Sequence, residues 1–205
     1  MRVSQEEKGR SHARIVESAA RLFRERGLDG ASVADVMKEA GMTHGGFYKH
    51  FEGKDALVEA ALAIAFDQFV AALRGEEVDA AVSQVFPRLA STLRVGEAGR
   101  SEAAVRSVYL SDAHVAERGL GCPVAALGTE IARSSASIRR AFGAGVRRVV
   151  EAIAARRRGT AAARRAAAIR EFSMLVGAVV IARASDPETG EEVLSACAGD
   201  ARNDR

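Results

Sequence analysis

The chain has 205 residues, 48% of them hydrophobic and 28% charged, and a formal net charge of +3 at pH 7. This length allows one large domain or two small ones, and the apolar fraction excludes a largely disordered chain. Alanine and arginine are the most frequent residues and only three prolines occur, so the composition predicts an all-α protein.

Cysteine usage and apolar runs bear on the cell compartment. Cys122 and Cys197 lie far apart in the chain, which argues against a disulfide framework and suits a reducing compartment. The N-terminal stretch contains acidic residues and lacks the apolar core of a secretion signal. The longest apolar run, Met174 to Ala182, is about half the length that spans a bilayer. We therefore expect a cytoplasmic protein with no membrane association.

The basic excess is unevenly placed. Residues 1–60 contain ten Lys or Arg against ten Asp or Glu, whereas residues 130–184 contain twelve arginines against three glutamates. We interpret the arginines as solvated helix faces. If the N-terminal part binds nucleic acid, it must do so through locally placed charge.

The first predicted helix covers residues 12–26, where Ile15, Ala19, Leu22 and Phe23 form one apolar stripe. Gly27 follows as a helix-ending glycine. Basic residues gather before this helix and in its first turn, where the helix dipole disfavours them. An external anion could offset this cost. The basic residues in question are Lys8, Arg10, His12 and Arg14.

Two short helices follow. Ser32 is expected to cap a helix over 33–40, with Asp35 as its acidic partner at the third helical position. Thr43 is expected to cap a third helix over 43–51 that buries Phe47 and Phe51. The connection at 41–43 has the length of the turn in a helix-turn-helix unit.

Downstream, the chain becomes alanine-rich and broadly apolar. A long helix is predicted over 54–73, followed by helices near 78–94, 100–112, 123–134, 136–157, 161–184 and 187–198. We expect a helix-turn-helix domain at 1–53 and a helical effector-binding and dimerisation domain at 54–205.

The third short helix carries the functional signal. In a helix-turn-helix unit the second helix of the pair presents its N-terminal residues to base edges in the major groove. Gly45 and Gly46 would let this helix approach DNA closely, which leaves Thr43, His44 and Lys49 as donors. The alternative is a polar loop, which would not explain a capped helix with phenylalanines four residues apart.

Three segments of the N-terminal part resemble the TetR/AcrR family of transcriptional regulators. The resemblance covers residues 12–59 and rests on LFRERG (22–27), ASVADVMKEAGM (31–42) and FYKHFEGKDALVEAAL (47–62). It implies phosphate contacts from Tyr48, His50 and Lys54 and a DNA contact from Thr43. It places His44, Gly45, Gly46 and Lys49 in the base-contacting region. Ser32 completes the expected DNA-binding set.

The C-terminal part resembles the family more loosely, through residues 109–127 and 176–194. The resemblance implies a homodimer formed by the helices near 136–157 and 161–184. It also implies a repressor that a small hydrophobic effector releases from a pseudo-palindromic operator. Candidate pocket residues, each also explained as ordinary core, are Phe66, Phe69, Phe86, Tyr109, Cys122, Phe142, Phe172 and Met174.

Other functions are weighed against this one. A DNA-binding activator or a ligand-independent DNA binder would share the N-terminal unit, as would a helical enzyme or adaptor. Cys122 before Pro123 could be a reactive thiol at a helix N-terminus, which would permit a redox sensor acting through Cys122, or a small buried hydrophobe. His114 and Cys122 lack a third orienting group for nucleophilic catalysis. The four histidines have no metal-ligand spacing, so no metal, cofactor or catalytic residue is expected.

Overall fold

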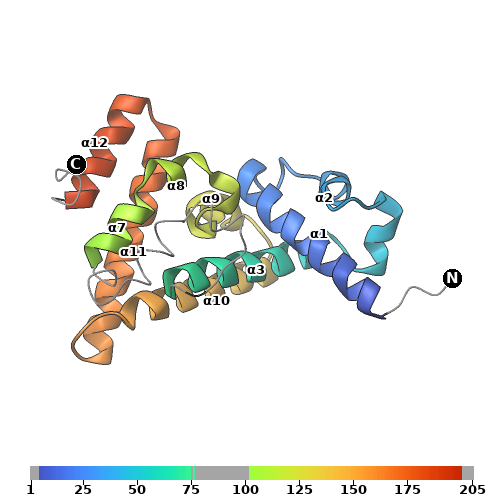
Figure 1. Ribbon diagram of the computed structural model, residues 1–205, viewed down its shortest axis with the longest axis horizontal. Helices are drawn as coiled ribbons and strands as arrows, with labels where there is room; N and C mark the ends of the chain where they lie inside the picture. Colours follow the sequence, from blue (N-terminus) through green and yellow to red (C-terminus); the bar gives the residue numbers. More distant parts are fainter. Residues whose placement is uncertain (1–4, 75, 77–101, 200–205) are drawn as a thin grey trace.

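The protein is described here from a computed structural model, which covers residues 5–74, 76 and 102–199. Within these ranges all regular structure is helical and no strand occurs, which confirms the all-α prediction. The helix predicted at 78–94, and Phe86 within it, lie outside the described residues. Figure 1 shows an N-terminal unit on the right and a larger helical part on the left, with α3 running between them.

The N-terminal unit contains α1 (Gln5–Arg26), α2 (Val33–Glu39) and the 3-10 helix η1 (His44–Lys49). Gly27 ends α1 with φ of 81°, a left-handed conformation that favours glycine. Ser32 and Asp35 form the predicted reciprocal cap at the start of α2. These three signals are local in sequence, and the structure confirms each of them.

Two local predictions in this unit are wrong. α1 begins at Gln5 rather than at residue 12, so Glu6 and Glu7 occupy its first turn and complement the helix dipole. The basic residues from Lys8 onward therefore do not oppose the dipole as expected. Gln, Glu and Lys are good helix formers, which accounts for the early start.

The third helix is η1, a 3-10 helix rather than a continuous α-helix over 43–51. Thr43 takes the extended N-cap conformation, but its side chain makes no capping hydrogen bond. The backbone closes instead through the Gly46 N–H, which donates to the Thr43 carbonyl at 3.0 Å. Adjacent glycines lower α-helix propensity, which favours a short, tight helix here.

The connecting helix α3 (Lys54–Arg74) packs along α10 (Ala136–Ala154) and against α1. An 18-residue window of α3 has a mean hydropathy of 1.8, and 56% of it is buried inside the protein. This window is more extensive than the run at 174–182 that the sequence analysis singled out. Its apolar character is accounted for by packing on two sides, as in a core helix.

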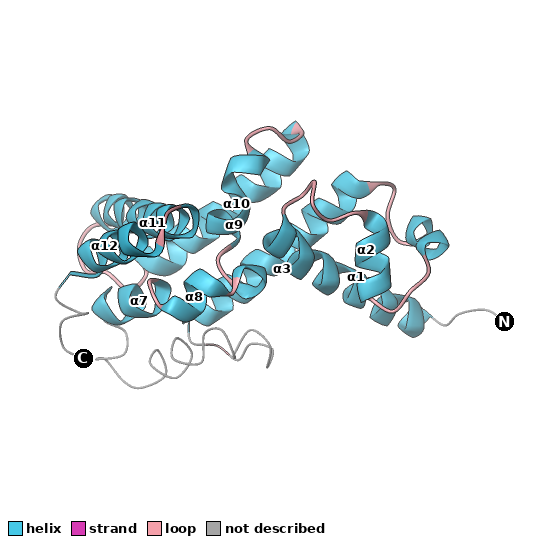
Figure 2. Cartoon of the chain, turned by 90° about the horizontal axis from the view of Figure 1, so that it is seen from above, coloured by secondary structure: helices cyan, strands magenta, loops and turns pink. Residues whose placement is uncertain are grey.

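The remaining helices form the C-terminal part. They are α7 (Glu102–Tyr109), α8 (Asp112–Ala116), η2 (Arg118–Leu120), α9 (Pro123–Ile131), α10, α11 (Ala161–Ala184) and α12 (Pro187–Ala198). The single helix predicted over 100–112 is wrong, because Ser111 begins a new helix by accepting from the His114 N–H at 3.3 Å. Figure 2 shows α7, α11 and α12 at the end of the molecule opposite α1 and α2.

α10 lies against α3 at very close range. A β-carbon at Gly145 would stand 2.1 Å from the Phe66 ring, so only glycine fits this helix crossing. Gly145 lies in the helix near 136–157 that the sequence analysis expects at the dimer interface. Gly145 instead serves packing within one chain.

Candidate DNA interface

The surface of η1 combines a buried anchor with exposed polar groups. Phe47 is 2% exposed and stacks on Phe51, with ring centroids 5.6 Å apart. His44 and Lys49 are exposed, and Tyr48 is 72% exposed. Phe47 therefore fixes η1 on the N-terminal unit while its neighbours project into solvent.

The adjacent glycines are not required by the protein itself. A β-carbon at Gly45 would meet nothing within 4 Å, and one at Gly46 would meet only Met37 Cε at 3.6 Å and Thr43 Oγ1 at 3.9 Å. Neither glycine has a positive φ. Among the described residues, therefore, no close contact and no left-handed backbone accounts for glycine at these positions, and the surface of η1 is open to close approach by another molecule.

A groove of about 590 Å³ separates η1 from the first turns of α1. We call it the α1–η1 groove. Lys8 and Ser11 line it from α1, and Thr43, Lys49 and His50 line it from η1 and its flanks, beside Gln5, Glu7, Met42 and Gly46. The sequence analysis noted the charge of Lys8 but missed that α1 begins at Gln5. As a result, Lys8 and Ser11 belong to α1 and lie next to η1.

His50 lies among basic neighbours in this groove. Desolvation lowers the pKa of His50, and the charges of His12, Lys8 and Lys49 lower it further. Its ring centroid is 5.9 Å from that of His12, which stacks on Phe51 at 4.7 Å. Within the described chain, Nδ1 of His50 is buried without a hydrogen-bond partner. A phosphate in the groove would add a counter-charge to these basic groups.

Two residues of the predicted DNA-binding set make bonds inside the protein. The Lys54 ammonium donates to the Leu28 carbonyl and lies 5.9 Å from the centroid of the Phe23 ring. The Ser32 hydroxyl accepts from the Asp35 N–H at 3.1 Å. Contacts of Lys54 or Ser32 with phosphate stay predictions, and Lys54 would have to exchange its carbonyl partner to make one.

The N-terminal unit is joined to the C-terminal part by buried polar bonds. The Leu28 N–H donates to Glu130 Oε2 at 2.6 Å. Arg24 is 4% exposed and donates to the carbonyls of Ala20 at 2.8 Å and Gly121 at 3.1 Å. Burial lowers the pKa of Arg24 to about 10. These bonds fix the C-terminal end of α1 on α9 and on the turn before it.

The aromatic residues predicted to line an effector pocket form a packed cluster. Ring centroids are 5.6 Å apart for Phe66 and Phe142, 6.1 Å for Phe69 and Tyr109, and 6.4 Å for Tyr109 and Phe172. Met174 packs against the same core. Core packing accounts for their burial, since apolar spacing marks a buried stripe but does not distinguish core from cavity wall. Their role in an effector pocket stays a prediction.

Cys122 and His114 are also core residues. Cys122 is the N-cap of α9 with Pro123 at its first position, as predicted. However, Cys122 is 0% exposed and burial raises the pKa of its thiol, which argues against a reactive thiol. His114 Nε2 accepts the backbone N–H of Cys122 at 3.0 Å, and Nδ1 lies 2.6 Å from the Tyr109 carbonyl. This geometry assigns the Nδ1–H tautomer and supports no Cys–His nucleophile.

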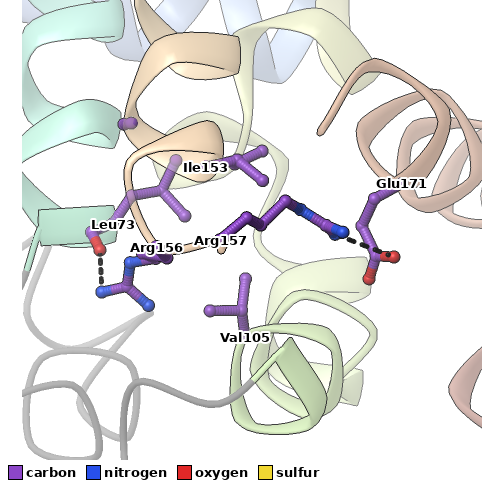
Figure 3. A pocket seen from close by; sticks show the side chains of 7 residues that line it. Leu73, Val105, Ile153, Arg156, Arg157 and Glu171 are labelled. Atoms are coloured by element: carbon purple, nitrogen blue, oxygen red, sulfur yellow. Dashed lines mark hydrogen bonds and ion pairs between the residues drawn. The ribbon is translucent and has the colours of Figure 1, made fainter. Parts of the chain in front are cut away.

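A cavity lies at the far end of the C-terminal part (Figure 3). Its lining residues are Leu73 of α3, Val105 of α7, Ala152 and Ile153 of α10, Arg156 and Arg157 after α10, and Glu171 of α11. We call it the Arg157 cavity. The sequence analysis assigned the arginines of this region to solvated faces, but the Arg157 side chain is only 12% exposed.

Comparison with known proteins agrees with the geometry of the N-terminal unit. Residues 15–61 match the family described as "Bacterial regulatory proteins, tetR family". The uncharacterised HTH-type transcriptional regulator YvdT of Bacillus subtilis is 37% identical over 70 residues, or 32% of this chain and 36% of YvdT. The HTH-type transcriptional repressor KstR2 of Rhodococcus jostii is 40% identical over 48 residues, or 23% of this chain and 24% of KstR2. Each alignment spans about a third or less of the relative.

Likeness of fold extends over nearly the whole chain. The crystal structure of reduced Escherichia coli NemR superposes with a TM-score of 0.66 at 17% identity, covering 94% of this chain and 95% of NemR. At this level of identity the likeness establishes the fold alone.

Proposed function

We propose that this chain, whose residues 15–61 match the TetR family of bacterial regulatory proteins, is a ligand-responsive, DNA-binding transcriptional regulator, acting as a cytoplasmic homodimeric repressor. The observation that carries the proposal is the exposed η1 surface, whose two glycines nothing in the protein requires. Residues 1–53 would bind DNA and residues 54–205 would bind the effector and the partner subunit. α3 would connect the DNA-binding part of the chain to the effector-binding part.

Each subunit would place η1 in a major groove. Gly45 and Gly46 would allow close approach, while Thr43, His44 and Lys49 would donate hydrogen bonds to base edges. Tyr48, His50 and Lys8 would contact phosphates on either side. These contacts fix the position of η1, whereas the few side chains at its start carry the sequence preference.

The homodimer would form through α10 and α11. α11 carries Ile169 and Ile181, which are 45% and 46% exposed, so it presents apolar surface that a second subunit can cover. Two η1 segments held by such a dimer would contact half-sites roughly 34–36 Å apart, or slightly more. An effector that favours another spacing would release DNA, and a coupling of about 1–3 kcal/mol changes affinity 5–150-fold.

An electrophoretic mobility-shift assay against the DNA that flanks the protein's own coding region tests the proposal. We expect retardation at low salt, at a protein stoichiometry of two or a multiple of two per site. Retardation of unrelated DNA at the same protein concentration would show binding without specificity. No retardation at low salt would refute the proposed function.

A further inference from the structure

The Arg157 cavity has apolar walls contributed by three helices. Leu73, Val105, Ala152 and Ile153 are between 2% and 7% exposed, so their side chains belong to the core. The cavity measures about 20 Å³ as the side chains stand, and the gaps between its lining atoms, open solvent included, amount to about 350 Å³. Such walls favour the apolar body of a small ligand.

One end of the cavity already holds a carboxylate, that of Glu171. Arg106 donates two hydrogen bonds to the Glu171 carboxylate, from Nε to Oε1 at 3.0 Å and from a terminal nitrogen to Oε2 at 3.1 Å. Arg157 approaches Oε2 only at 3.5 Å. Figure 3 shows the Arg157 side chain extending toward Glu171. The Arg157 contact is the longer and weaker of the two, because charge-assisted N–H···O bonds are normally 2.7–2.9 Å long.

These contacts point to a ligand of defined chemistry. We propose that the effector is a small carboxylate with an apolar body, and that it binds in the Arg157 cavity with its carboxylate on the guanidinium group of Arg157. The inference rests on the proposed function and names the class of its effector. Glu171 keeps its two bonds to Arg106 when the ligand takes the place of Glu171 on Arg157.

The size of the cavity sets how the ligand enters. As the side chains stand, only about 20 Å³ of the space is wide enough for a water molecule. A ligand of several carbon atoms must therefore move the Arg157 side chain away from Glu171. The exchange replaces one carboxylate by another on the same guanidinium group, so Arg157 keeps an ionic partner throughout.

The cavity also holds the end of the helix that leads to the DNA-binding unit. Arg156 donates to the Leu73 carbonyl at 2.5 Å, near the C-terminal end of α3 (Figure 3). α3 runs about 30 Å from this point to Lys54, which bonds the Leu28 carbonyl. A ligand that displaces Arg157 also moves its neighbour Arg156, and thereby the anchor of α3. We expect this shift to reach the DNA-binding unit and lower DNA affinity.

Calorimetric titration of the full-length protein with butanoate, hexanoate and octanoate tests the inference, with 1-hexanol as the uncharged control. We expect the alkanoates to bind, with the affinity increasing with chain length until the cavity is filled. 1-Hexanol should bind at least tenfold more weakly than hexanoate. At a hundred times its Kd, the alkanoate should raise Tm by about 5–10 °C.

Two substitutions give opposite results under this inference. Arg157→Gln should weaken alkanoate binding at least tenfold, whereas Glu171→Gln should strengthen it, because the competing carboxylate is removed. Arg158→Gln changes an exposed arginine next in sequence and should leave the affinity unchanged. Circular dichroism and Tm of each variant without ligand verify that it is folded.

Three results would overturn the inference: no alkanoate binds, 1-hexanol binds as well as hexanoate, or Glu171→Gln weakens binding as much as Arg157→Gln does. The mobility-shift assay without ligand separates this outcome from failure of the proposed function. A protein that shifts its DNA but binds no alkanoate refutes the effector class alone. A protein that shifts no DNA refutes the proposed function, whatever it binds in the cavity.

Discussion

Gly45→Ala should make the protein more stable and less able to bind DNA. The added methyl group would meet no atom of the protein within 4 Å, and the backbone at Gly45 has no positive φ that alanine would resist. Replacing a helical glycine under these conditions stabilises a protein by about 0.4–1 kcal/mol, because the unfolded chain loses conformational freedom. For a chain of this size we expect Tm to rise by about 1–4 °C.

DNA affinity should change in the opposite direction. If η1 approaches the base edges as closely as proposed, the methyl group at position 45 holds it away and lengthens the neighbouring contacts. The loss of one base contact costs about 1–3 kcal/mol, so we expect the Kd for the operator to rise roughly 5–150-fold. Fluorescence anisotropy with labelled operator DNA measures this change, and differential scanning calorimetry measures Tm.

Gly128→Ala is the matched control. Gly128 lies in α9, outside the N-terminal unit that holds the proposed DNA contacts, and a β-carbon there would meet only Phe142 at 3.9 Å. It should raise Tm without changing DNA affinity. If Gly45→Ala binds the operator as tightly as the unchanged protein does, close approach is not the reason for glycine. A lower Tm for Gly45→Ala would refute the argument that position 45 is unstrained and open.

Three further predictions follow from the contacts above. Glu130→Ala should destabilise the protein by about 1–3 kcal/mol in urea unfolding, because the buried Leu28 N–H loses its charged acceptor. Burial lowers the pKa of His114 to about 4, so the folded state resists protonation. Stability should be complete above pH 6.5 and fall as the pH drops toward 4, and His114→Gln should flatten this dependence in melting curves. Lys8→Ala should weaken binding to all DNA sequences and reduce the slope of log K against log salt by about one.

Each of these predictions has a control or a contradicting result. Glu130→Gln retains an acceptor oxygen and should cost less stability than Glu130→Ala; equal losses would mean that the Leu28 bond contributes little. An unchanged pH profile in His114→Gln would place the acid sensitivity in other groups. His44→Ala should alter sequence preference rather than the salt slope. An unchanged salt slope in Lys8→Ala would remove α1 from the DNA interface.

Much of the candidate site was predictable because its signals are local. The capping pair Ser32 and Asp35, the terminating Gly27, and the anchor Phe47 each act within a few residues of their own position. Their spacing therefore predicted the helix-turn-helix unit and the exposed side chains of η1. The start of α1 and the helix type of η1 were predicted wrongly, although helix propensity accounts for both: good helix formers precede residue 12, and two adjacent glycines disfavour an α-helix in η1.

What only the tertiary structure decided involves partners that are distant in sequence. The hydrogen bond between Leu28 and Glu130 joins residues 102 positions apart, and the periodicity of neither segment predicts it. In the same way, the sequence around Arg157 is typical of a solvated helix end. Only the fold places Arg157 beside Glu171 and the apolar walls from α3, α7 and α10. Sequence fixes which residues can cap, turn or form an apolar stripe, since those are short-range energies. Which charges become buried depends on how the helices cross, and that is set by packing over the whole chain.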